Sequence, residues 1–157
     1  MLASALRFVR LPLLLLLIWA IARFSLGLAG VAYAPRGNAM FSIVGLTFIS
    51  CLYYGALSGR VGGFSWKGTL LVGVCIGLFG QILIFLATLV SFLGHLNTYF
   101  VHWDALNVQE GTVVAMRDAM MSRFGGLIFG GTLVPAITAL IGRGLGRLAP
   151  VPAGSSS

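Results

Sequence analysis

The sequence predicts an all-α integral membrane bundle of four transmembrane helices, and two observations on composition point to it. Hydrophobic residues make up 59% of the 157 residues and charged residues only 8%, whereas a soluble domain carries roughly 25% charged residues. The mean hydropathy of +1.02 agrees with this imbalance. So little polar surface excludes a soluble enzyme, a nucleic-acid-binding protein and a disordered chain as first interpretations.

Four long apolar runs are the third observation, since a membrane-crossing helix needs about 20 mostly apolar residues. The runs are expected at about 11–34, 39–57, 68–93 and 124–141. They are continuous rather than alternating, and lipid offers no partner for free backbone groups, so helices are predicted. One transmembrane domain then covers residues 1–148, and the Pro- and Ser-rich tail, 149–157, is predicted to be disordered.

The first run follows Arg7 and Arg10 and has two interpretations. Residues 11–22 could form the apolar region of a cleaved signal peptide. Apolar residues continue past Arg23, which favours an uncleaved transmembrane helix. A tight turn at Pro35-Arg36-Gly37-Asn38 is expected to lead into the second run.

The two later connections differ in length. Residues 58–67 form a short glycine-rich loop, whereas the third loop, about 94–123, is long. Thr112 resembles a helix N-cap. Apolar residues follow it at helical spacing: Val113, Met116 and Met120. A short amphipathic helix is therefore predicted within the third loop.

Basic residues predict the orientation in the membrane. The side with the termini and the second loop carries six of them: Arg7, Arg10, Arg60, Lys67, Arg143 and Arg147. The other side carries three: Arg36, Arg117 and Arg123. The positive-inside rule then places both termini in the cytoplasm, with the chain in the cytoplasmic (inner) cell membrane. The third loop, which also holds every acidic residue, faces outward.

Glycines four residues apart predict close helix packing. They occur at Gly55/Gly59, Gly73/Gly77 and Gly126/Gly130. Such pairs let helices approach within one bundle or between copies, and the sequence leaves both open. The expected partners are the lipid bilayer and, beyond it, other membrane proteins or a second copy of the chain; nucleic acid is not expected.

Arg23 is the most informative polar residue. In a helix over 11–34 it would lie near the bilayer centre, where a charge costs roughly 2.5–3.5 kcal/mol. Neutral polar residues at similar predicted depth are Thr47, Gln81 and Thr132. One interpretation is a buried polar layer around Arg23; the other is that Arg23 reaches back to the membrane surface.

The third loop contains a second candidate site. Its polar and aromatic members are His95, His102, Trp103, Asp104 and Glu110. His95 and His102 are seven residues apart, about 10.5 Å along a helix, so they would not grip one metal ion together. No metal-binding, nucleophile or cofactor motif occurs in the sequence. An interfacial loop is therefore favoured over catalysis, and neither a cofactor nor a metal is expected.

These observations lead to three functional hypotheses. The favoured one is a small accessory, assembly or scaffold subunit that binds lipid or other membrane proteins. The first alternative is an oligomeric transporter or channel with a polar site around Arg23 and Gln81. The second is an outward-facing enzyme or cofactor protein that uses His102 and Asp104.

Overall fold

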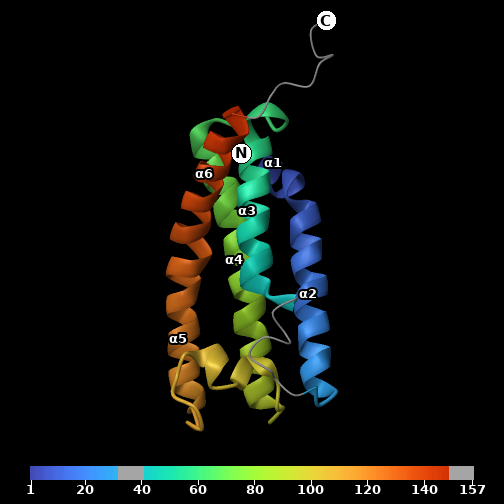
Figure 1. Ribbon diagram of the computed structural model, residues 1–157, viewed down its shortest axis with the longest axis vertical. Coiled ribbons are helices and arrows are strands. Elements are labelled where there is room, and N and C mark those ends of the chain that lie inside the picture. The colour runs from blue at the N-terminus through green and yellow to red at the C-terminus, as the bar shows by residue number, and fades with distance from the viewer. Residues whose placement is uncertain (32–40, 149–157) are drawn as a thin grey trace, which may run out of the picture.

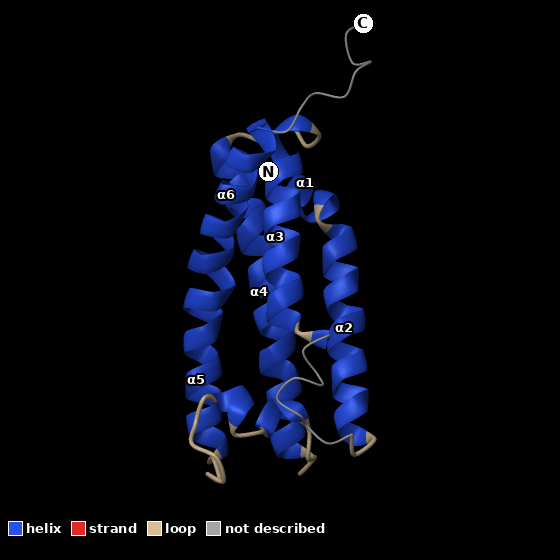
Figure 2. Cartoon of the chain, in the orientation of Figure 1, coloured by secondary structure: helices blue, strands red, loops and turns tan. Residues whose placement is uncertain are grey.

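The computed structural model describes residues 1–31 and 41–148, and every regular element in these ranges is helical. The long helices lie along the long axis of the molecule and alternate in direction (Figure 1). Short turns and loops connect them (Figure 2). The start of α1 and the end of α6 lie at one end, here called the terminal end; the third loop lies at the other, the loop end. The prediction of an all-α chain is confirmed.

Two helices form the N-terminal part: α1 (Leu2–Phe8) and α2 (Arg10–Leu28). They are separated at Val9, which has φ −96° and ψ 9°. Pro12 explains the break, because it has no N–H to donate to the carbonyl of Phe8 and its ring crowds that carbonyl in a continuous helix.

The first predicted span extended too far. α2 ends at Leu28, and Gly30 then adopts a φ of +70°, which glycine tolerates because it has no Cβ. Residues 32–34 of the predicted span lie outside the described residues, as do the predicted turn at 35–38 and the predicted tail at 149–157.

Serine caps begin the next two helices. α3 (Ile43–Arg60) starts after Ser42, whose hydroxyl accepts from the N–H of Gly45 at 3.1 Å. α4 (Trp66–Leu93) starts after Ser65, which accepts from the N–H of Gly68 at 3.3 Å. Each cap satisfies an N–H that the first helical turn leaves without a partner. α3 thus ends three residues later than expected, and α4 agrees closely with its predicted span.

The fourth helical segment corrects two predictions. α5 (Met116–Ile128) continues through a π-helical segment η4 (Phe129–Leu133) into α6 (Val134–Leu148). The short amphipathic helix predicted in the third loop is therefore the first part of this segment, and its N-cap is Ala115 rather than Thr112. Pro135 accounts for the π-helical turns, because it cannot donate to the carbonyl of Gly131 and the helix must widen before it.

Glycines allow α6 to pack closely on α3 and α4. A Cβ at Gly73 would lie 2.5 Å from the carbonyl oxygen of Pro135, and one at Gly146 would lie 2.6 Å from that of Ala56. A Cβ at Gly55 would overlap the backbone of Ala139. The glycine faces predicted from the sequence are thus occupied by neighbouring helices of the same chain.

Within residues 1–31 and 41–148, three helical segments are long and apolar enough to cross a membrane: Arg10–Leu28, Trp66–Leu93 and Met116–Leu148. α3 has 18 residues and is long enough, but with Arg60 at its end its mean hydropathy is too low for it to be counted among them. The structure therefore supports a membrane protein with three such helices, packed together with α3.

Candidate functional site

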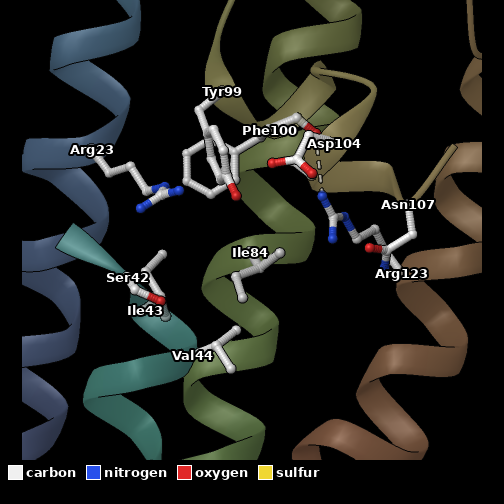
Figure 3. A pocket seen from close by; sticks show the side chains of 11 residues that line it. Arg23, Ser42, Ile43, Val44, Ile84, Tyr99, Phe100, Asp104, Asn107 and Arg123 are labelled. Carbon is white, nitrogen blue, oxygen red and sulfur yellow. Dashed lines mark hydrogen bonds between the residues drawn. The ribbon is translucent and has the colours of Figure 1, made fainter. Parts of the chain in front are cut away.

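A cavity of about 230 Å³ lies at the loop end of the bundle. α3 begins part-way along α2 and α4 (Figure 1), and the third loop folds back over the remaining space. The lining side chains come from four helices and this loop (Figure 3): Arg23, Ser42, Ile43, Val44, Ile84, Tyr99, Phe100, Asp104, Ala105, Asn107 and Arg123. Aliphatic groups form one wall, and polar groups converge from the others.

Arg23 borders the cavity from α2 and is only 5% exposed. Its guanidinium carbon lies 3.5 Å from the centroid of the Tyr99 ring. A guanidinium over an aromatic face is attracted by the ring's electrons, with a gain of about 2 kcal/mol when water is excluded. Tyr99 therefore keeps the Arg23 charge at the wall of the cavity.

Arg123 borders the same cavity from α5 and is held by two hydrogen bonds. Its Nε donates to the hydroxyl of Thr88 at 3.2 Å, and one terminal nitrogen donates to the carbonyl of Phe100 at 3.3 Å. Thr88 is fully buried and itself donates to the carbonyl of Ile84 at 2.8 Å. The guanidinium is thus fixed between α4 and the loop.

The loop that completes the cavity is attached firmly to α4. The hydroxyls of Ser91 and Thr98, both buried, share a hydrogen bond of 2.6 Å. Two 3₁₀ turns follow, η2 (Tyr99–Val101) and η3 (Asp104–Leu106), and they bury Phe100 and Leu106. Buried apolar anchors at both turns explain how a long loop can present Tyr99 and Asp104 in a defined position.

Of the candidate residues predicted in the third loop, only Asp104 lines the cavity. The rings of His102 and Trp103 lie 5.1 Å apart, and neither residue is part of the lining. His95 is exposed in the turn after α4, with a φ of +49°, and Glu110 is exposed farther along the loop. The cavity therefore combines two arginines with one aspartate and has a net positive charge.

The four residues of the predicted polar layer do not meet at one site. Arg23 lines the loop-end cavity, whereas Thr47 and Gln81 line a second cavity of about 150 Å³. The hydroxyl of Thr132 donates within its own helix, to the carbonyl of Ile128. Because α2 ends at Leu28, Arg23 lies about 7.5 Å from the end of its helix rather than near the middle.

Sequence reasoning missed Tyr99 and Arg123 as members of the site. Arg123 was assigned to the third loop, although a helix start at Met116 makes it a charged residue inside a long apolar helix, the signal that singled out Arg23. Tyr99 carried no signal of its own. Its position over Arg23 depends on how the loop folds back.

Comparison with known proteins gives no family. No protein-family profile, curated protein sequence or solved structure matches the chain. Among the described residues, no group of three or more His, Cys, Asp and Glu side chains is placed to hold a metal ion. The cavity itself contains two fixed guanidinium groups, which are suited to binding an anion.

Proposed function

We propose that this chain is a four-span protein of the cytoplasmic membrane that acts as an accessory, assembly or scaffold subunit and binds an anionic lipid headgroup in the loop-end cavity. One observation carries the proposal. Arg23 and Arg123, from different helices, are fixed around a cavity in which Asp104 is the single acidic lining residue. Guanidinium groups that are already fixed before the ligand arrives bind phosphate without the entropic cost of ordering their side chains.

The position of α3 supports a fourth span. Eighteen residues give a length of about 27 Å, close to the roughly 30 Å of the hydrocarbon core. Its polar residues Thr47, Ser50 and Ser58 are buried in the bundle, whereas apolar residues such as Ile49 and Leu52 are exposed. The lower hydropathy of α3 therefore reflects polar groups that face other helices, and its outer surface suits lipid.

A lipid headgroup suits the cavity better than a soluble anion. The cavity lies near the helix ends, where lipid headgroups are expected. Its lining contains arginines together with the aliphatic side chains of Ile43, Val44 and Ile84. Such a mixed surface accepts both the charged and the apolar part of an amphipathic ligand. Binding to an acidic segment of a neighbouring membrane protein is the competing outcome in the experiment below.

The orientation can be tested with reporter fusions. Because six basic residues lie at the terminal end or beside it, both termini are expected in the cytoplasm. Green fluorescent protein at the C-terminus should fluoresce, and alkaline phosphatase inserted after Gly111, in the exposed part of the third loop, should be active. The opposite pattern at both positions would contradict the proposed topology.

Lipid binding can be tested by native mass spectrometry of the full chain released from nanodiscs that contain phosphatidylglycerol. Arg123→Gln should weaken retention of this lipid about tenfold or more, since hydrogen bonds to charged groups contribute roughly 1.5–3 kcal/mol. Arg117→Gln is the matched control, because Arg117 is exposed on the same helix. Equal retention by both variants and the wild type would exclude this site. A protein that is co-released from native membranes only when Arg123 is present would identify a protein partner instead.

A second candidate function, a small transporter, is favoured by the π-helical segment. Such segments occur often at functional sites, and a Cβ at Gly130 within it would lie 2.9 Å from the amide nitrogen of Gln81. Gln81 and Thr47 line the adjoining cavity. Gln81→Leu should then abolish solute flux in proteoliposomes while phosphatidylglycerol retention is kept.

A further inference from the structure

A third cavity lies at the terminal end of the bundle, between the C-terminal parts of α3 and α6. Its volume is about 200 Å³, and it is lined by Ala56, Gly59, Arg60, Arg143, Gly146 and Arg147. Small residues bring the two helices together here, and three arginines border a hollow that is open to the surface, since Arg60 and Arg147 are exposed. None of the lining residues is acidic.

Hydrogen bonds to a buried polar network fix the guanidinium of Arg143. One terminal nitrogen donates to the carbonyl of Phe64 at 2.6 Å and to the hydroxyl of Thr69 at 2.5 Å. Thr69 and Ser58 are fully buried, and their hydroxyls share a hydrogen bond of 2.7 Å. The Nε of Arg143 is buried and has no hydrogen-bond partner within the part of the chain that the structure describes. A donor of this guanidinium is therefore still unsatisfied.

Trp66 positions two of the arginines together. The guanidinium carbons of Arg143 and Arg147 lie 4.7 Å and 4.9 Å from the centroid of its ring. Arg60 also approaches, since it donates to the backbone carbonyl of Arg147 at 3.4 Å. Positive charges gathered around one cavity repel one another, and a bound anion offsets this repulsion.

The described chain offers no acidic side chain to neutralise this cluster. Asp104 in η3, Glu110 in the third loop and Asp118 in the first turn of α5 belong to the loop end, at the opposite end of the bundle (Figure 1). The carbonyl ends of α3 and α6 contribute only partial negative charges. Three full positive charges thus surround the cavity.

We propose that the terminal-end cavity binds a phosphate group with a net negative charge, through Arg60, Arg143 and Arg147. Arginine suits this ligand because its planar fork matches phosphate oxygens in pairs. The cavity lies at the helix ends beside Trp66, a residue type favoured at membrane interfaces. An anionic phospholipid headgroup and free phosphate share this chemistry, and the site is independent of the loop-end cavity.

The test uses the full chain in phosphatidylcholine nanodiscs with and without phosphatidylglycerol. Native mass spectrometry counts the phosphatidylglycerol molecules retained by the wild type, Arg143→Gln and Arg147→Gln. Arg147→Gln leaves the network of Arg143 with Thr69 intact, so its effect does not depend on folding. Each variant should retain one anionic lipid about tenfold less well. Arg10→Gln is the matched control, because Arg10 is exposed and is the first residue of α2, which directly follows α1.

Two further arms separate the sources of the phosphate. If a headgroup fills the cavity, inorganic phosphate should not displace the lipid. If soluble phosphate fills it, inorganic phosphate should instead raise the unfolding temperature of the chain in phosphatidylcholine nanodiscs, with the gain lost in Arg147→Gln. That result would support a phosphate site whose ligand is soluble phosphate. If Arg10→Gln loses as much lipid as Arg147→Gln, the lipid is attracted by overall charge and the proposal is overturned. Unchanged lipid retention in every variant would also overturn it.

Discussion

Replacing Gly142 by alanine is expected to lower the thermal stability of the bundle strongly. A Cβ at this position would overlap the carbonyl oxygen of Leu52 and lie 2.9 Å from its carbonyl carbon. Backbone atoms cannot rotate away as the end of a side chain can, so α6 and α3 must separate. Overpacking of this kind costs about 1–3 kcal/mol or more. Thermal unfolding of the purified chain in nanodiscs measures the effect.

Gly144 supplies a control on the same helix. A Cβ there would meet nothing within 4 Å, and alanine is better than glycine in a helix by about 1 kcal/mol. Gly144→Ala should therefore keep or raise the unfolding temperature. Gly55→Ala repeats the test from the opposite helix, because a Cβ there overlaps the backbone of Ala139. Similar effects of Gly142→Ala and Gly144→Ala would contradict the close approach of α3 and α6.

Replacing Arg23 by glutamine is the second change with a large expected effect. Arg23 is 5% exposed and stacks on Tyr99 at the wall of the loop-end cavity. Its loss removes one of the two positive charges in the lining and leaves Asp104 with less compensation. Retention of phosphatidylglycerol at this end should fall by about ten- to a hundredfold, the loss expected for one charge-assisted contact.

Variants of Tyr99 test whether the ring positions the charge. Tyr99→Phe keeps an aromatic face and should retain the lipid as the wild type does, whereas Tyr99→Leu removes the face and should weaken retention. Arg10→Gln is the control for Arg23, since it removes an exposed charge from the other end of α2. Normal retention by Arg23→Gln, in a variant that unfolds at the wild-type temperature, would exclude Arg23 from the site.

The loop-end and terminal-end cavities are built in a similar way from residues of several helices. In each, one guanidinium stacks on an aromatic ring: Arg23 on Tyr99 at the loop end and Arg143 on Trp66 at the terminal end. In each, an arginine also donates to a buried threonine of α4: Arg123 to Thr88 and Arg143 to Thr69. The threonines in turn donate to backbone carbonyls within or before α4. α4 thus supplies a buried polar residue near each end for an arginine from the last helical segment.

The helical class, the apolar runs and the glycine-rich faces were open to prediction because they depend on local sequence. Lipid requires every backbone group to bond within its own segment, so a long apolar run has few structural choices. Helix ends were less certain: Gly30 stops α2 although apolar residues continue, and α5 begins before the apolar run does. Hydropathy shows where a helix can lie in lipid, but caps and glycines determine where it ends.

The sequence by itself determined that this is a helical membrane protein with an uneven distribution of charge, and it singled out Arg23 and Asp104. Only the tertiary structure decided which side chains surround them. Tyr99 reaches Arg23's cavity because the third loop folds back onto α4, and Arg123 reaches it because α5 packs against α4. Arg60 meets Arg143 and Arg147 because α3 and α6 pack through glycines. Local patterns specify the helices, whereas these contacts join residues far apart in the chain and depend on the packing of whole helices against one another.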